Sequence, residues 1–220
     1  MKNFYDEEER VIRNEPLQVR EINGHREVDF YLIDVIEDVK DYVDFLREIE
    51  MCNKGDLITV HINCYGGAVD VSLNIYDSLR NSDADVKISI EGPCCSSASM
   101  IALAGDMWSV SKHASIMIHS WSEGLYGKWH EILASIDFTK KSYEKHFREI
   151  YKNFMTDEEI KNCLEGKDYY FDSDEIMKRL QSFTKEEDER EKKINEIADK
   201  FSSMAEKEID KFLNSKGKKK

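Results

Sequence analysis

The chain has 220 residues, of which 40% are hydrophobic and 35% are charged, and its formal net charge is -13. This length fits one main domain with a sizeable core and excludes two full catalytic domains. The negative charge disfavours nucleic acid as a partner, and no apolar run approaches the roughly 20 residues that a membrane-spanning helix needs.

Three predicted strands alternate with three predicted helices in the first half of the chain. Residues 28–34 have the pattern of a strand, and apolar residues at helical spacing predict a helix over 35–50. The run LITVHIN (57–63) is nearly continuous and β-branched, which predicts a strand covered on both faces. A turn at residues 65–67 then leads into a second helix stripe.

The next strand is predicted at residues 86–91, and the small apolar residues of 96–104 predict a buried helix. Strands that alternate with helices require parallel pairing through crossover connections. The sequence therefore predicts an α/β domain.

Longer helices are predicted further along. Two short apolar runs, MWSVS and ASIMIH, precede a long helix over 126–154. Thr156 and Glu159 have the spacing of a capping box, which predicts the start of another helix. From about residue 184 the composition becomes strongly charged, with apolar residues at near-helical intervals, and this predicts an amphipathic helical tail.

The cysteines and the N-terminus indicate a reducing compartment. The five cysteines are an odd set without a Cys-x-x-Cys pair, which argues against a disulfide framework and a zinc site. The first 15 residues are acidic where a signal peptide would be apolar. We expect a cytoplasmic protein with reduced thiols and no metal or other cofactor.

Two of the predicted strands end in turns of glycine and small residues that lead straight into helices. Gly66 and Gly67 follow one strand, and residues 92–97 (GPCCSS) follow the next. The first N–H groups of a helix are free to donate and its dipole favours negative charge, so such turns can stabilise an oxyanion. Each turn alone has an ordinary explanation as a backbone turn or a serine N-cap, and only the pair indicates chemistry.

A serine nucleophile needs a base and a group that orients the base. Ser96, Ser97 and Ser99 are the candidate hydroxyls, and His119 ends an apolar run where a strand would deliver an imidazole to the sheet edge. The chain has 45 acidic residues, so composition alone cannot select the orienting carboxylate.

Four segments follow one another along residues 26–182: HINCYGGAVDVSLNIYDSL, GPCCSSASMIALAG, SIMIHSWSEGLYG and GKDYYFDSDEIMKRL. In order and spacing they resemble the motifs of the proteolytic subunit of the Clp protease (ClpP, peptidase S14), in its divergent phage and prophage branch. One such match is weak, whereas four in order are specific.

The resemblance implies a ClpP/crotonase-like superhelix of strand-strand-helix units. SEGLYGKWHEI resembles the start of the family's protruding strand-helix handle. The chain then divides into an N-terminal segment (1–25), a ClpP-like protease domain (26–182) and a charged C-terminal helical extension (183–220), which has no counterpart in the housekeeping members.

The resemblance also selects among the serines. Without gaps, the family's nucleophile falls on Ser96, four residues after Gly92 and nine before Gly105. Ser99, in the familiar Ala-Ser-Met triplet, stays open as an alternative that needs an insertion before it and a deletion after it. Ser96 also lies at the predicted helix start, whereas the hydroxyl of Ser99 would face the protein or bond back to a carbonyl.

By the same resemblance His119 is the general base, Asp168 is the carboxylate that orients it, and the N–H groups of Gly67 and Ser97 form the oxyanion hole. The chain departs from the family at Cys64-Tyr65, which replaces the usual Ser-Pro, and at Ser97, which replaces a methionine. Only the backbone N–H of Ser97 is needed, so activity is compatible with that replacement.

The implied function is a serine endopeptidase that cleaves unfolded or threaded polypeptides inside stacked heptameric rings, a tetradecamer. The implied partners are an AAA+ unfoldase and, for a phage head-maturation role, capsid or scaffold proteins. Two alternatives stay open: a catalytically silent structural or assembly subunit, and a crotonase-type acyl-CoA enzyme that uses the same pair of N–H donors.

Overall fold

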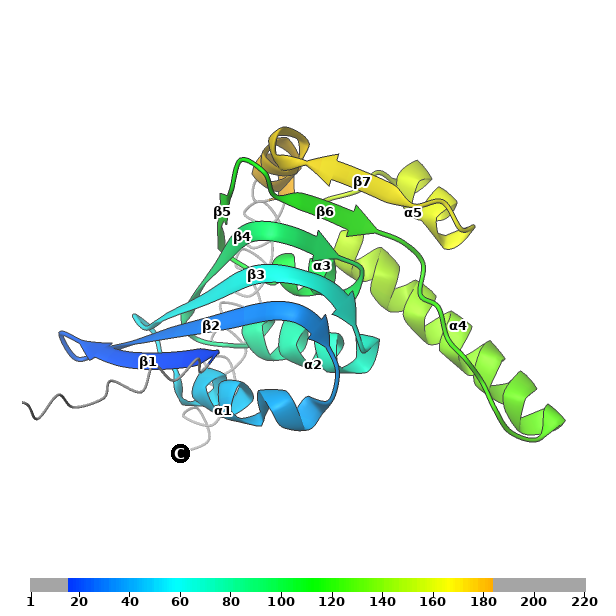
Figure 1. Cartoon of the computed structure of the whole chain (residues 1–220), viewed down its shortest axis with the longest axis horizontal. Coiled ribbons are helices and arrows are strands. Elements are labelled where there is room, and N and C mark those ends of the chain that lie inside the picture. The colour runs from blue at the N-terminus through cyan, green and yellow to red at the C-terminus, as the bar shows by residue number, and fades with distance from the viewer. Residues whose placement is uncertain (1–15, 184–220) are drawn as a thin grey trace, which may run out of the picture.

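A seven-stranded sheet organises the protein (Figure 1). The computed structural model describes residues 16–183 of the chain. The strand order is β1-β2-β3-β4-β6-β7, and β5 pairs with β4 beside this path. The strands are β1 (Leu17–Ile22), β2 (His25–Ile36), β3 (Leu57–Gly67), β4 (Asp85–Cys95), β5 (Met107–Val110), β6 (Ser115–Ile118) and β7 (Tyr169–Asp172).

The helices connect these strands. A 3-10 helix (Val39–Tyr42) and α1 (Val43–Met51) follow β2, whereas α2 (Val69–Arg80) follows β3. Beyond β4 the helices are α3 (Ser97–Ala102), α4 (Trp129–Tyr151) and α5 (Asp157–Leu164). Residues 173–183 are also helical.

The central strands are parallel, which confirms the predicted α/β architecture. β2 pairs with β3, β3 with β4, and β4 with both β5 and β6 in parallel register. Antiparallel pairs occur at the two edges, β1 with β2 and β6 with β7. The carboxyl ends of β3 and β4 therefore lie side by side, with Cys64 opposite Cys94.

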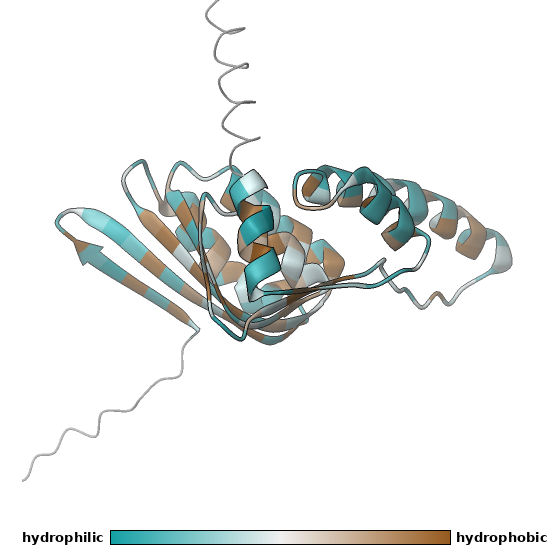
Figure 2. Cartoon of the chain, turned by 90° about the horizontal axis from the view of Figure 1, so that it is seen from above, coloured by the Kyte–Doolittle hydropathy of each residue, from teal (hydrophilic) through white to brown (hydrophobic). Residues whose placement is uncertain are grey.

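One face of the sheet is buried, and the other is more open. On β3 the side chains of Ile58, Val60 and Ile62 are fully buried, whereas His61 is half-buried and Asn63 is exposed. The expectation that this strand is covered on both faces therefore holds only for its first half, because on the second face Thr59 is buried whereas Asn63 is exposed. Its apolar side chains alternate with polar ones, as they do in a strand with one buried face. Figure 2 shows the helices gathered on one side of the curved sheet.

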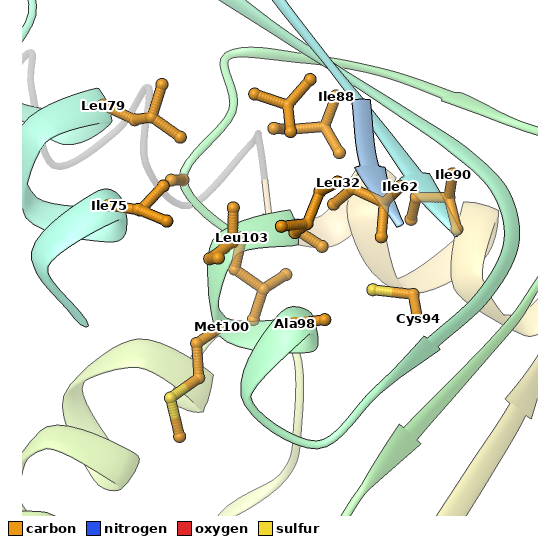
Figure 3. Close-up of a cluster of buried hydrophobic side chains, with 14 of the residues drawn as sticks. Leu32, Ile62, Ile75, Leu79, Ile88, Ile90, Cys94, Ala98, Met100 and Leu103 are labelled. Atoms are coloured by element: carbon orange, nitrogen blue, oxygen red, sulfur yellow. The ribbon is translucent and has the colours of Figure 1, made fainter. Parts of the chain in front are cut away.

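The buried face packs against α2 and α3. Figure 3 shows side chains from the two helices converging on side chains from the strands. Ile75 and Leu79 of α2 and Leu103, just after α3, meet Ile88 and Ile90 of β4 in one buried cluster. Every residue of α3 is buried, which confirms the predicted buried helix.

The sheet extends further than the sequence pattern indicated. β2 continues to Ile36 through an irregular pairing after Asp34, whose φ is +59°. The helix expected from residue 35 therefore begins only at Val39, as a 3-10 turn capped by Asp38. Residues 17–22, expected within the N-terminal segment, form β1 and pair with β2.

Helix α4 extends away from the sheet (Figure 1), as expected for a handle. The residues just before it, 119–128, form no strand in the structure, which differs from the expected strand-helix handle. A strand needs a neighbour for its backbone hydrogen bonds, and this segment has no strand partner within residues 16–183. The predicted capping box is present, since Thr156 and Glu159 bond reciprocally at the start of α5.

Several large apolar side chains of α4 and the segment before it are exposed. They are Leu125, Tyr126, Trp129, Leu133, Ile136 and Phe138. None of the helices in the described part of the chain combines the length and apolar composition needed to cross a membrane. The predicted tail from residue 184 lies outside the described residues.

Candidate active site

The carboxyl ends of β3 and β4 bring the two predicted turns into direct contact. A Cβ atom added to Gly66 would lie 2.5 Å from the carbonyl oxygen of Cys95 and 2.7 Å from the Cβ of Ser96. Gly66 also has a φ of +90°, which side chains rarely adopt. Glycine is therefore required here, because the β3 turn must lie directly against the turn that carries Ser96.

Ser96 has a strained backbone conformation at the start of α3. Its φ is +54° and its ψ is -130°, an unfavourable region for a residue with a side chain. The N–H of Ser96 donates to the carbonyl of Met117 at 2.7 Å, so pairing with β6 holds this conformation. Strain of this kind is concentrated at functional sites, and a sharp strand-to-helix turn exposes a nucleophile in many hydrolases.

His119 points its imidazole at Ser96. The Nε2 atom of His119 lies 2.8 Å from the Oγ atom of Ser96, within hydrogen-bond distance, and both side chains are half-buried. The contact arises because β6, which pairs with the end of β4, stops one residue before His119. With Nε2 as the acceptor, the pair has the arrangement of a hydroxyl nucleophile and its base.

Ser99, the alternative nucleophile, faces the core. Its Oγ lies 2.6 Å from the phenolic oxygen of Tyr151 and 2.6 Å from the carbonyl oxygen of Ser96. The side chains of Ser99 and Tyr151 are each 1% exposed. His119 is therefore in contact with Ser96 and not with Ser99.

Asp168 immediately precedes β7, the strand that pairs with β6. β6 and β7 are antiparallel and their pairing ends with Ile118 opposite Tyr169, so His119 and Asp168 are the first residues beyond the paired segment. Within residues 16–183 the exposed carboxylate of Asp168 makes no hydrogen bond or ion pair with His119. The structure therefore brings Ser96 and His119 together and leaves Asp168 adjacent to the pair.

Cys163 of α5 is buried close to the end of β6. Its thiol lies 3.9 Å from the carbonyl oxygen of Ile118. Burial, and then the negative charge of Asp168, raises the pKa of this thiol to about 11. The thiol therefore stays protonated at neutral pH and packs beneath the candidate site.

The two expected oxyanion donors differ in their hydrogen bonding. Ser97 is the first residue of helix α3, and its N–H has no acceptor within the described residues. The N–H of Gly67 donates to the hydroxyl of Ser97 at 2.9 Å. This hydroxyl also lies 3.2 Å from the carbonyl of Gly67, to which it donates. One donor is thus free and the other is bonded to a side chain.

A small, largely enclosed pocket of about 20 Å³ lies beside Ser96 and His119. Its walls are mainly apolar and come from α2, α3, α4 and the segment after β6. They are formed by Val69, Leu73, Ser97, Met100, Trp121, Tyr143, His146 and Phe147. Trp121 and Tyr143 contact each other with ring centroids 5.4 Å apart.

His146 is a pocket residue that the sequence did not indicate as part of the site. Helix α4 places it in the pocket wall with His119. The neighbouring Phe147 is a buried core residue. The spacing of apolar residues along α4 could therefore have shown that His146 lies at the edge of the buried face of the helix.

Cys95 directly precedes Ser96 in the chain. Burial raises the pKa of the Cys95 thiol, which disfavours a thiolate next to Ser96. Residues 16–183 contain no group of His, Cys, Asp and Glu side chains arranged to hold a metal ion.

Comparison with known proteins gives one consistent family. The Clp protease family model matches residues 33–180. An ATP-dependent Clp protease proteolytic subunit of Bacteroides fragilis is 30% identical over 108 residues, which are 48% of this chain and 50% of that protein. The subunit of the same name from Deinococcus radiodurans is 30% identical over 130 residues, 55% of this chain and 60% of that protein. The chain thus spans about half the length of the curated relatives it matches.

Proposed function

Because the chain belongs to the Clp protease family, we propose that it is a serine endopeptidase that cleaves peptide bonds in unfolded or threaded polypeptides. The observation that carries this proposal is the 2.8 Å contact between Nε2 of His119 and Oγ of Ser96. The contact lies at a strained strand-to-helix turn and faces a pocket. A buried structural serine needs neither feature.

In the proposed reaction Ser96 is the nucleophile and His119 the general base. The Oγ of Ser96 attacks the peptide carbonyl carbon while Nε2 of His119 accepts the hydroxyl proton. When the carbon–nitrogen bond breaks, the imidazolium gives this proton to the departing amine, and an ester remains on Ser96. A water molecule that loses a proton to His119 then hydrolyses the ester and regenerates the serine.

The other residues of the proposed site stabilise the charges that develop on the substrate oxygen and on His119. In our proposal the N–H groups of Gly67 and Ser97 donate to the oxyanion of the tetrahedral intermediate, where removal of one donor typically costs on the order of 3 kcal/mol. Asp168 orients the imidazole and stabilises its protonated form. Asp168 and His119 both lie one residue beyond the same end of the β6–β7 pairing, which supports this role. Catalytic hydrogen bonds often tighten only when substrate is bound.

We also propose that several copies assemble into a chamber, with stacked heptameric rings as the expected form. The exposed apolar side chains of α4 and the segment before it support self-association, since such surfaces mark interfaces. An AAA+ unfoldase that threads substrates, and capsid or scaffold proteins as substrates in a phage, belong to the same proposal.

Hydrolysis of a short fluorogenic peptide by the assembled full-length chain tests the activity. We expect turnover by the wild type and a loss of about 1000-fold or more in Ser96→Ala and in His119→Ala. Short peptides need no unfoldase, so the result does not depend on that partner. An assembled wild type that hydrolyses no peptide and reacts with no serine probe would instead favour the silent subunit.

A further inference from the structure

The side chain of Ser97 is bonded to one of the proposed oxyanion donors. The N–H of Gly67 donates to the Oγ of Ser97 at 2.9 Å, and the hydroxyl donates back to the carbonyl of Gly67 at 3.2 Å. Ser97 is 1% exposed, so bulk water does not compete for either bond. Both backbone polar groups of Gly67 are thus held by one hydroxyl.

Gly67 has little freedom to turn away from this hydroxyl. A Cβ atom added to Gly67 would lie 2.0 Å from the carbonyl oxygen of Ile36, and its φ is +151°. The next residue, Ala68, donates its N–H to the same carbonyl at 2.8 Å. The direction of the Gly67 N–H is therefore fixed by the contact with β2, and the side chain of Ser97 is the partner that can move.

We infer that the hydroxyl of Ser97 occupies the Gly67 N–H in the resting protein and that the substrate oxyanion displaces it when the tetrahedral intermediate forms. The N–H has a single hydrogen, so an oxyanion and a hydroxyl compete for it. Rotation of the Ser97 side chain about its Cα–Cβ bond frees the donor. This inference rests on the proposed function, because the competition matters only if Ser96 forms such an intermediate.

The competition has a definite kinetic consequence. Rotation of the Ser97 side chain breaks its hydrogen bonds with the N–H and the carbonyl of Gly67. Loss of one bond between neutral groups corresponds to roughly a two- to tenfold change in an equilibrium or rate constant. Ser97→Ala removes the competing oxygen and leaves the backbone donors in place. We therefore expect this substitution to accelerate acylation, although it removes a polar group from the proposed oxyanion hole.

The test compares second-order rate constants for labelling of the assembled full-length chain by a fluorophosphonate, together with kcat/KM for a short peptide ester. We expect both constants to rise about two- to tenfold in Ser97→Ala. Ser97→Cys, in which a weak acceptor fills the same space, should change them in the same direction. Ser97→Thr keeps the competing hydroxyl and should not show this rise.

Ser72→Ala is the matched control. Ser72 is fully buried on α2, and its hydroxyl donates to the carbonyl of Ala68 at 2.9 Å, away from the Gly67 donor. Its loss should leave both rate constants unchanged. Amide hydrogen exchange of the peptide that contains Gly67 gives a readout without turnover, and we expect faster exchange in Ser97→Ala than in the wild type.

The outcomes separate this inference from the proposed function. Faster labelling in Ser97→Ala and Ser97→Cys, with no rise in Ser97→Thr and no change in Ser72→Ala, supports the inference. A wild type that is labelled at Ser96 while folded Ser97→Ala is labelled equally fast or more slowly contradicts the inference alone. The hydroxyl then supports the oxyanion hole or is irrelevant to it. Absence of labelling in all variants contradicts the proposed function, and the inference with it.

Discussion

The hydroxyl oxygen of Ser99 lies 2.6 Å from the phenolic oxygen of Tyr151, and both side chains are buried. Burial raises the pKa of Tyr151, so the phenol keeps its proton at any physiological pH. The phenol can donate to Ser99, whose own hydrogen then goes to the carbonyl of Ser96 at 2.6 Å. This chain of bonds connects the end of α4 to the start of α3 beneath the candidate nucleophile.

Ser99→Ala should therefore reduce stability and leave the chemistry of Ser96 intact. Removal of the Ser99 hydroxyl leaves the buried phenol of Tyr151 without its partner, which costs about 1–3 kcal/mol. Denaturant unfolding measures the loss, and labelling of Ser96 should continue. Tyr151→Phe removes the other partner, and the double variant should lose less stability than the sum of the single variants.

Gly67→Ala should prevent the β3 turn from forming as observed. The new Cβ would lie 2.0 Å from the carbonyl oxygen of Ile36, at a φ of +151°. We expect a loss of about 2 kcal/mol or more in unfolding free energy and no labelling of Ser96, because the oxyanion donor moves with the turn. Gly124→Ala is the control, since its Cβ would meet no atom within 4 Å. Equal labelling in both variants would show that the Gly67 turn is dispensable.

Arg179→Ala should destabilise the part of the fold that positions Asp168. The guanidinium donates two bonds of 2.8 Å to Glu159 on α5 and one of 2.9 Å to the carbonyl of Phe154. The bond from Arg179 holds the pKa of Glu159 below its usual range, so this contribution to stability is present at neutral pH and is lost as the pH falls through that lowered pKa.

We expect Arg179→Ala to cost about 2 kcal/mol at neutral pH and less in acid, as measured by urea unfolding. Arg148→Ala is the matched control. Arg148 is an exposed arginine that bonds to Glu144 on α4 at 3.0 Å, and its loss should cost less than about 0.5 kcal/mol. Similar losses in the two variants would contradict a special structural role for Arg179.

Asp168→Asn should slow hydrolysis if Asp168 orients His119. The amide cannot stabilise the imidazolium, so kcat/KM for a short peptide should fall by on the order of a hundredfold or more, with folding intact. Asp174→Asn makes the same charge change at an exposed aspartate beyond β7 and should have no such effect. If the two variants hydrolyse the peptide equally fast, another group orients the imidazole or none does.

The sequence pattern predicted the parallel sheet and α3 well, because the order of strand and helix patterns and the small apolar residues can be read directly from the sequence. Alternating strand and helix patterns required parallel pairing, and the small apolar residues of 96–104 could only be accommodated in the core. Helix boundaries were less predictable. Val35 fits a helical stripe as well as it fits a strand, and only the pairing of β2 with β3 decides between them.

The pairing of Ser96 with His119 could be expected from the motifs, whereas the hydrogen bonds around it could not. The resemblance gave Ser97 a role only through its backbone N–H, and a sequence does not show where the hydroxyl of a residue just past a turn will point. His146 was missed for a similar reason, since its place in the pocket depends on how α4 packs against α3. The handle strand was expected from resemblance, but it has no strand partner within residues 16–183.

The most direct test of the central claim is the site of covalent attachment of a fluorophosphonate to the assembled full-length chain, mapped by peptide mass spectrometry. We predict a single adduct on Ser96 that is absent in Ser96→Ala and retained in Ser99→Ala. Loss of the imidazole in His119→Ala should slow its formation, because Nε2 of His119 lies 2.8 Å from the reacting oxygen. An adduct on Ser99, or no adduct on an assembled wild type, would contradict the claim that Ser96 is the nucleophile of a serine peptidase.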